Sequence, residues 1–426
     1  MQVKLDYGRT GLTVTVPDHN LEGVLTLQEA KAHYWPERGV RDAARQPIGC
    51  PPLPGLARGK KSACIVISDI TRPVPNRAIL PQLLGVLDVS GVPREATTIL
   101  VATGTHRPCT EAELREMVGE EILRDYHVVN HDARDPDTHR YLGDTPKGVP
   151  MWVDTRFLDA ELKISVALIE PHFMAGFSGG RKNICPGICA METVKVWHGP
   201  RFIGHELSDS GSVDGNPVHE DALYVALKAG LDFICDVTMD ENRKVTGIFA
   251  GDPEKAWLRG VQAAREAATA EVSQPVDIVV TTTAGYPLDL TFYQVAKGMV
   301  GALPILKENG TIVIASRCEE GVGGKEFTDT LLRIDDLDAF VEETRQPGFF
   351  IPDQWEIHEL AKARARAEVL MYTEGIPAET LEQCFVKPVP SVEEGIRQAL
   401  DKHGPLARIA VIPKGPYVLP RVAGQQ

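Results

Sequence analysis

The stretch that decides the fold is Ala63-Cys-Ile-Val-Ile-Ser68, an apolar run that passes directly into the polar segment Asp69-Ile-Thr-Arg-Pro73. An apolar run of this length is typical of a strand buried on both faces, as strands of parallel sheets are. Four further runs of the same kind follow along the chain, at residues 98–102, 163–168, 277–281 and 311–315.

Helical patterns lie between these predicted strands. Thr110 and Glu113 form a capping box, and Asn216-Pro217 and Asp252-Pro253 each place a capping residue before a proline. We expect the helix from Asp252 to continue to about residue 272, with further helices at 290–307, from 353 onward and at 392–402. Alternating strands and helices predict an α/β fold with largely parallel sheets.

The 426 residues are too many for one ordinary core, because domains usually hold roughly 100–200 residues. Pro275 stands between a long predicted helix and a new strand, so we place two α/β domains at 1–271 and 272–426. The N-terminal domain is expected to bind the cofactor and carry the catalytic residues. The C-terminal one is expected to add substrate contacts, and its last segment to pack back on the first domain. The interdomain cleft is the expected active site.

Composition narrows the class of protein. Apolar residues make up 43% of the chain and charged residues 24%, and the formal net charge is −14. So negative a surface repels phosphate backbones, which argues against a nucleic-acid partner. The chain has neither a basic start followed by an apolar run nor an apolar stretch of about 20 residues, so we expect a cytoplasmic enzyme without a membrane segment. Eight scattered cysteines favour reduced thiols over disulfides.

Reactive side chains follow the predicted strands, where ligands bind in parallel α/β sheets. Asp69 and Arg72 come after the first strand, His106 after the second and His172 after the third. A polar segment, 316–321, follows the last. Asp69 and Arg72 either hold an anion or pair with each other within one turn. The histidines either transfer protons near neutral pH or bond to backbone carbonyls. Several such strand ends together indicate one site.

A glycine-rich segment and a group of two cysteines and a histidine indicate a function less specifically than the strand-end residues do. The segment Gly176-Phe-Ser-Gly-Gly-Arg-Lys-Asn183 offers close backbone approach and positive charge to a phosphate, or is a tight turn before a helix. It is not a Walker A loop, because Arg181 separates Gly180 from Lys182. Cys185, Cys189 and His198 imitate a zinc site, but no second cysteine pair follows at zinc spacing, and buried thiols are favoured.

A third group of side chains occurs in the second predicted domain. Gln294 and Lys297 are three residues apart on a predicted helix, and Tyr293 and Lys297 are four apart, so each pair shares a face. The face either points into the cleft or is solvated. Trp355 starts another predicted helix, where a tryptophan more often belongs to a core.

Taken together and in order, these segments resemble the lactate racemase family, whose members use a nickel-pincer nucleotide. The resemblance covers nearly the whole chain. The matching text is Asp69-Ile-Thr-Arg-Pro, Gly104-Thr-His-Arg107, Pro171-His-Phe-Met-Ala-Gly-Phe-Ser-Gly-Gly-Arg-Lys182, His198 and Tyr293-Gln-Val-Ala-Lys297.

The resemblance implies a role for each matching residue. Lys182 matches the lysine that can tether the cofactor through a thioamide, and His198 matches the nickel ligand beside two sulfurs and a ring carbon. Two further sets follow: Asp69, Thr71, Gly179 and Gly180 would bind the nucleotide, and Arg72, Tyr293, Gln294, Lys297 and Trp355 would contact the substrate. His106 and His172 match two acid/base residues that move the hydroxyl proton while a hydride leaves Cα and returns to the other face of a planar 2-ketoacid.

The implied partners are a small 2-hydroxyacid and the proteins that synthesise the cofactor. One departure bears on the substrate, because Arg181 stands where the best-known lactate enzymes have a small residue. If Arg181 faces the cleft, it favours malate or another diacid; it could equally bind the cofactor phosphate or face solvent. Which 2-hydroxyacid is used, and whether Lys182 bonds covalently to the cofactor, are left open by the sequence.

Two other functions are considered beside a racemase. A nickel-free hydrolase or transferase would use the 179–182 loop for a nucleotide phosphate and the histidines for general catalysis. A non-catalytic cofactor carrier would have no need of two histidines, Gln294 and Lys297.

Overall fold

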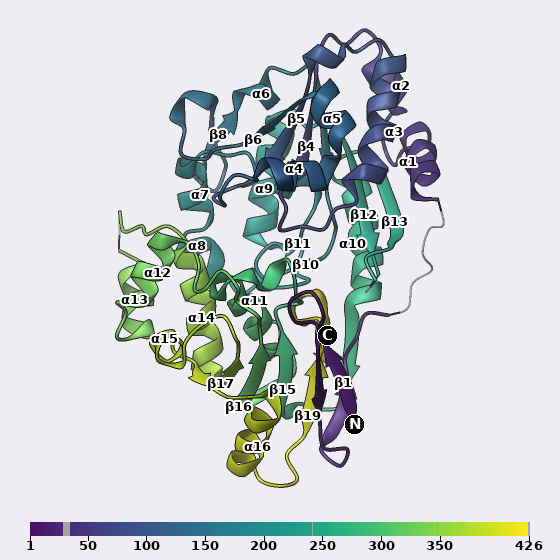
Figure 1. Cartoon of the computed structure of the whole chain (residues 1–426). Helices are drawn as coiled ribbons and strands as arrows, with labels where there is room; N and C mark the ends of the chain where they lie inside the picture. The colour runs from purple at the N-terminus through teal and green to yellow at the C-terminus, as the bar shows by residue number, and fades with distance from the viewer. Residues whose placement is uncertain (29–34, 241, 347, 425–426) are drawn as a thin grey trace. The chain divides into compact units, whose positions relative to one another are not determined.

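The structure is a computed structural model that describes residues 1–28, 35–240, 242–346 and 348–424. The chain forms two compact units (Figure 1). Unit 1 comprises Met1–Gln28, Pro171–Phe173 and Ala268–Gln426, and unit 2 comprises Glu29–Glu170 and Met174–Ala267. Each unit contains a six-stranded sheet with helices packed on it, so the predicted α/β class with largely parallel sheets is confirmed.

The sheet of unit 2 has the strand order β13-β12-β9-β4-β5-β6. Its strands are β4 (Ala63–Ser68), β5 (Thr97–Ala102), β6 (His127–Asn130), β9 (Leu162–Val166), β12 (Phe233–Met239) and β13 (Val245–Gly251). All neighbours run parallel except the β12–β13 pair. Every residue of β4 is buried, which is the reason its sequence is continuously apolar.

Helices and a hairpin complete unit 2. The helices are α1 (Pro36–Arg45), α2 (Leu53–Ala57), α3 (Asn76–Val89), α4 (Glu111–Val118), α5 (Glu120–Asp125), α6 (Thr155–Leu158), α7 (Met191–Trp197), α8 (Pro200–Ile203), α9 (Pro217–Lys228) and α10 (Lys255–Ala268). The hairpin joins β7 (His139–Asp144) to β8 (Pro150–Asp154). One core cluster packs α1 to α5 on side chains of β4, β5, β9 and β12.

The sheet of unit 1 is parallel throughout, with the order β18-β17-β16-β15-β19-β3. Its strands are β3 (Leu21–Val24), β15 (Val276–Thr282), β16 (Leu306–Ala315), β17 (Ala367–Tyr372), β18 (Lys387–Pro388) and β19 (Ile409–Ile412). The helices of this unit are α11 (Val295–Val300), α12 (Lys325–Leu331), α13 (Leu337–Glu343), α14 (Gln354–Arg366), α15 (Ala378–Gln383) and α16 (Val392–His403).

The first 28 residues fold with the C-terminal half of the chain, whereas the sequence placed them in a domain at 1–271. The hairpin of β1 (Gln2–Leu5) and β2 (Leu12–Thr15) buries Val3, Leu5 and Val14 in the core of unit 1, and β3 extends the sheet beside β19. At the other end of the chain, β20 (Leu419–Val422) pairs with β14 (Thr269–Val272) inside unit 1. The physical reason is that strand pairing satisfies the backbone of both terminal segments, β3 beside β19 and β20 beside β14, while Val3, Leu5 and Val14 are buried in the core.

Two predicted helices differ from the structure. Asp252 does cap α10, since its carboxylate accepts from the Lys255 N–H at 2.9 Å, but the helix ends at Ala268 and the expected continuation to 272 is wrong. There β14 forms instead, because pairing with β20 satisfies its backbone. The expected helix at 290–307 is also wrong. Only α11 is α-helical there, and short 3-10 turns flank it. Gly298, Gly301 and Pro304 disfavour a longer helix.

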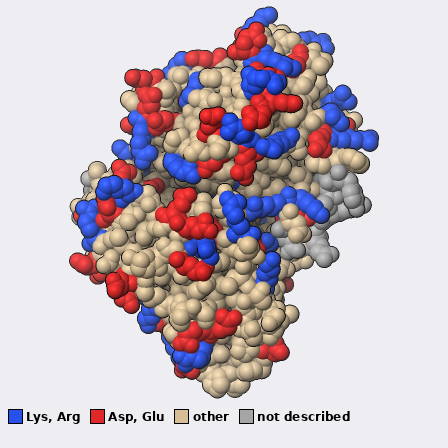
Figure 2. Space-filling view, in the orientation of Figure 1, with Lys and Arg blue, Asp and Glu red and all other residues tan. Residues whose placement is uncertain are grey.

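The surface carries charges of both signs. On the face seen in Figure 2, basic and acidic side chains are interspersed. Within the described part of the chain, no helix combines the length and the apolar character needed to cross a membrane.

The core of unit 2 gives a stability prediction. Ile65 of β4 is fully buried, so Ile65→Ala should lower the free energy of unfolding by about 2–5 kcal/mol through lost burial and a cavity. The matched control is Val89→Ala at the end of α3, where the side chain is 91% exposed and the change should stay within about 0.5 kcal/mol. Equal effects of both variants in urea denaturation would contradict the assigned core.

Candidate active site

A carboxylate and an imidazole meet where β4 and β5 end. Asp69 follows β4 and is almost fully buried, and its Oδ2 lies 2.7 Å from Nδ1 of His106, which follows the parallel neighbour β5. The Thr71 hydroxyl donates to the other Asp69 oxygen at 2.5 Å. An ionised carboxylate only accepts, so His106 carries its proton on Nδ1 and presents Nε2 as the reactive nitrogen. This is the geometry of an oriented general base.

Asp69 stays ionised in this position. Burial raises the pKa of its carboxyl, but the charge and hydrogen bond of His106, the Thr71 hydroxyl and the Arg72 guanidinium outweigh it, and the net pKa lies below the usual value. Asp69, Thr71 and His106 are therefore brought together as predicted, with Asp69 in direct contact with a histidine.

Arg72 is paired with a carboxylate that the sequence analysis passed over. Its Nε lies 3.2 Å from Oε1 of Glu170, which follows β9, the other neighbour of β4. Both side chains are largely buried, at 19% and 13% exposure, so the pair is little screened by water. Glu170 precedes Pro171 and His172. Its position at the end of a predicted strand was the sequence signal that could have identified it as a site residue.

The loop that carries Lys182 is tied to the same edge of the sheet. It is a short 3-10 turn, η3 (Gly180–Asn183). The buried Asn183 amide donates to the Ser165 hydroxyl at 3.1 Å and the Val166 carbonyl at 2.9 Å, both on β9, and accepts from the Ser68 hydroxyl of β4 at 3.0 Å. One side chain thus fixes this turn to two strands.

The glycines before Lys182 are required by packing. Gly179 and Gly180 have φ values of 82° and 49°, and a Cβ on Gly179 would lie 2.8 Å from Oδ2 of Asp236 on β12. The same Asp236 oxygen accepts the Gly180 N–H at 2.7 Å. The tight-turn interpretation is therefore correct for these residues, and their predicted contact with a nucleotide stays a prediction.

Arg181 points into the protein interior. Its side chain is fully buried, with the guanidinium carbon 3.8 Å from the centroid of the Trp257 ring. It donates to the carbonyls of three loop residues, Ala175, Ser178 and Gly179, and to Nδ1 of His219 at 3.1 Å. Burial lowers the pKa of Arg181 to about 9, which leaves it protonated at neutral pH. The expected orientations of Arg181 toward a cleft, a phosphate or solvent are wrong, and its side chain holds the loop together instead.

Lys182 and His198 both contact the ring of one tryptophan, Trp197. The Lys182 ammonium is 5.5 Å from the centroid of the Trp197 ring, and the His198 ring meets the same ring edge-on with centroids 4.6 Å apart. His198 follows α7 and lies 3.2 Å through Nδ1 from the Val194 carbonyl. A carbonyl only accepts, so Nδ1 holds the proton and Nε2 is the nitrogen that can bind a metal.

The remaining predicted residues gather in unit 1. His172, on the short strand β10 (Pro171–His172), stacks on Phe173 with ring centroids 4.8 Å apart. The Lys297 ammonium lies 5.2 Å from the Phe173 centroid and 5.9 Å from that of Tyr293, and it donates to the Gln294 side-chain oxygen. Trp355 joins this group, since its indole N–H donates to the Tyr293 hydroxyl at 2.9 Å.

Glu356 is a second carboxylate that the sequence analysis missed. It is buried on α14 next to Trp355, and its Oε1 lies 3.7 Å from the Lys297 ammonium. Burial, with the Asp353 and Glu356 carboxylates, raises the pKa of Tyr293 well above its usual value, so its hydroxyl stays protonated. A charged residue on the buried face of a predicted helix was the signal that could have found Glu356.

All eight cysteines are free thiols, so the structure has no disulfide framework. Cys185, Cys189 and His198, considered above as a zinc site, are not among the described side chains whose ligand atoms lie close enough together to hold a metal. Within the described ranges, the metal-type grouping of side chains comprises other residues, His131, His139 and Asp154.

Comparisons with known proteins agree along the whole chain. The model of the lactate racemase N-terminal domain matches residues 7–211, and that of the C-terminal domain matches residues 272–419. The lactate racemase of Thermoanaerobacterium thermosaccharolyticum is 35% identical over 98% of this chain and 99% of its own. That of Lactiplantibacillus plantarum is 34% identical over 97% and 98%.

Solved structures give the same result. The lactate racemase apoprotein from T. thermosaccharolyticum superposes with a TM-score of 0.92 at 35% identity, over 99% of this chain and 100% of that one. A Thermotoga maritima protein with a TM-score of 0.71 covers 91% of this chain and 98% of its own, and at 17% identity it shares the fold.

The fold is that of an α/β protein with largely parallel sheets, and the Asp69–His106 pair has a geometry suited to proton transfer. The chain belongs to the lactate racemase family and is an isomerase. Family membership implies a metal-dependent cofactor. The hydrolase, transferase and carrier alternatives do not fit this class.

The loop beneath Lys182 gives a pH prediction. Burial raises the pKa of Asp236 to about 7, against the opposing effects of the Gly180 N–H and the Arg181 charge. The folded pKa exceeds the unfolded value of about 3.9, so the contribution of Asp236 to stability is greatest below about pH 4 and is lost as the pH rises through 7.

Asp236→Asn removes this titration. We expect the melting temperature of the wild type to fall relative to that of Asp236→Asn as the pH is raised from 4 to 8. Thermal unfolding of both proteins across this range measures the difference, and a difference that does not change with pH would contradict the assignment.

Proposed function

We propose that this chain racemises a small 2-hydroxycarboxylic acid with a single carboxylate, lactate being the first candidate, with a nickel-pincer nucleotide as cofactor. The observation that carries the proposal is the Asp69–His106 pair at the edge of the sheet where the Lys182 loop is anchored. The names of the full-length relatives supply the reaction class and the first substrate to test.

In the proposed mechanism, His106 takes the substrate hydroxyl proton through Nε2. Asp69 fixes the ring through Nδ1 and stabilises the imidazolium that forms. His172 takes the corresponding proton from the other enantiomer, with its ring oriented by stacking on Phe173. Two bases are needed because the enantiomers direct their hydroxyls differently once the carboxylate is held.

The residues present fit the proposed cofactor. His198 is protonated on Nδ1 by its bond to Val194, so its Nε2 is oriented as an imidazole ligand, which suits Ni(II) beside sulfur donors. Lys182 lies over the adjoining Trp197 ring, within the same group of side chains. When bound, the cofactor supplies a hydride acceptor for Cα, so that no carbanion forms. Its synthesis proteins are the proposed partners.

The charges of the assigned residues argue against a second substrate carboxylate. Arg72 is paired with Glu170, and Lys297 lies beside Glu356 and Gln294. We assign Lys297, Gln294, Tyr293 and Arg72 to the one substrate carboxylate, and Trp355 to the position of Tyr293. A second carboxylate would need a further cation, and the guanidinium of Arg181, which suggested a diacid, is used by the loop.

The dual-base mechanism predicts a specific pattern in two variants. His106→Gln and His172→Gln should each lower the racemisation rate by about 10²–10⁴-fold at unchanged nickel content. Each variant should still form 2-ketoacid in a single turnover from one substrate enantiomer. The enantiomer used by His106→Gln should be the opposite of the one used by His172→Gln. Chiral chromatography of quenched reactions measures both, and full racemisation by either variant would contradict the mechanism.

The substrate assignment is tested with protein produced beside the cofactor-synthesis proteins. We expect about one nickel per chain by elemental analysis. With single enantiomers of lactate, malate, 2-hydroxyglutarate, phenyllactate and gluconate, monocarboxylates should react at least about tenfold faster than the two diacids. A higher kcat/KM for malate would overturn the charge-balance argument, and turnover without nickel would overturn the cofactor.

A further inference from the structure

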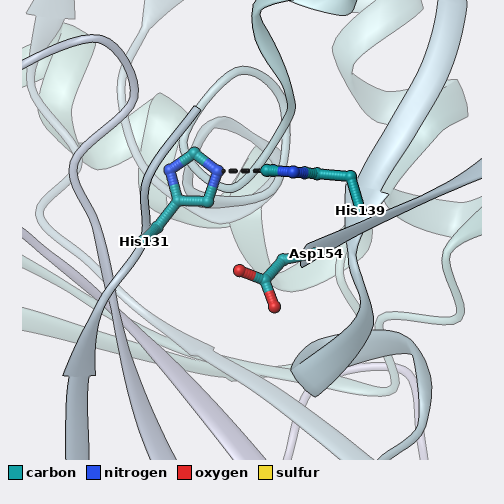
Figure 3. A group of neighbouring side chains, drawn as sticks. All are labelled: His131, His139 and Asp154. Carbon is teal, nitrogen blue, oxygen red and sulfur yellow. Dashed lines mark hydrogen bonds between the residues drawn. The ribbon is translucent and has the colours of Figure 1, made fainter. Parts of the chain in front are cut away.

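Three buried side chains that have no part in the proposed reaction converge in unit 2. His131 follows β6, and His139 and Asp154 face each other as register partners across the β7–β8 hairpin. One ligand atom from each lies within 4.8 Å of the others, and all three residues are buried (Figure 3). The two Nε2 atoms are 2.9 Å apart. Two imidazoles and a carboxylate are a common ligand set for first-row transition metals.

The tautomer of His139 is determined by its surroundings. Its Nδ1 lies 2.9 Å from the Asp135 carbonyl, which only accepts, so Nδ1 carries the proton and Nε2 presents its lone pair. A backbone carbonyl on the other ring nitrogen is the usual partner of a metal-binding histidine.

His131 can present its lone pair without losing a proton from the protein. The Thr103 hydroxyl donates to the His131 carbonyl at 2.8 Å, so its oxygen, 3.3 Å from Nδ1, can accept a hydrogen bond from a protonated Nδ1. With the proton on Nε2, His131 bonds to His139; with the proton on Nδ1, both Nε2 lone pairs converge.

Asp154 retains one position for a ligand. Arg156 donates to Asp154 Oδ1 from its backbone nitrogen and from Nε, each at 2.9 Å, and to Oδ2 from Nη2. A carboxylate has about four acceptor sites, so the remaining one is on Oδ2. The guanidinium orients the carboxylate as partners of ligating carboxylates do.

We propose that His131, His139 and Asp154 bind one divalent transition-metal ion, zinc in the first instance, at a site separate from the proposed nickel ligand His198. Two nitrogens bound to the same tetrahedral zinc are roughly 3.3 Å apart, so the imidazoles need to separate by only a few tenths of an ångström. A water molecule completes the coordination. The ion joins the end of β6 to the β7–β8 hairpin and stabilises both.

The test is zinc binding by chelator-treated protein produced without the cofactor-synthesis proteins. Calorimetric titration with zinc chloride should give about one tight site per chain. In His139→Asn the amide Nδ2–H can still donate to the Asp135 carbonyl while the Nε2 ligand is lost. We expect this variant to bind zinc at least about 100-fold more weakly.

Two controls separate this site from others. His127→Asn changes an exposed histidine on β6, and His198→Asn removes the proposed nickel ligand; both should bind zinc like the wild type. Wild-type protein without a tight site, or equal affinity in His139→Asn, would overturn the proposal. If His139→Asn does not fold, zinc-edge anomalous scattering from wild-type crystals decides: a peak between His131 and His139 supports the site, and no peak there contradicts it.

Discussion

The interaction on which the rest of unit 2 depends is the set of hydrogen bonds made by the buried Asn183 side chain. They join the turn that carries Lys182 to β4 through Ser68 and to β9 through Ser165 and Val166. Asp69 follows β4 directly, so the lysine turn and the Asp69–His106 pair share one rigid edge. Arg181 holds the loop before this turn by donating to the carbonyls of Ala175, Ser178 and Gly179, so its charge stabilises the loop conformation.

Carboxylates accompany the cations assigned to the substrate. Glu170 pairs with Arg72 and Glu356 lies beside Lys297, so each cation is oriented and partly neutralised before any substrate binds. A buried cation without such a partner would be costly. On the proposed assignment, a substrate with one carboxylate disturbs this balance less than a diacid does.

The strands were the most predictable part of the fold, because full burial imposes an apolar run such as Ala63–Ser68 on the sequence. Helix caps that depend on neighbouring residues in the sequence, such as the capping box of Thr110 and Glu113, were confirmed too. What could not be predicted depends on distant pairing: β14 replaces the end of a helix because β20 lies beside it, and the first 28 residues join a sheet formed late in the chain. In the site, strand ends located Asp69 and His106, but only side-chain packing shows that Arg181 is buried and that Glu170 and Glu356 take part.

The central claim is that Asp69 orients His106 as a base, whereas the resemblance assigned Asp69 to the cofactor. The most direct measurement is the racemisation rate of Asp69→Asn at a measured nickel content per chain. The account predicts wild-type nickel content with a rate lowered by about 100-fold or more, because Asn can hold the ring but cannot stabilise its charge. An unchanged rate at full nickel content would contradict it, and so would a loss of rate fully explained by lost nickel.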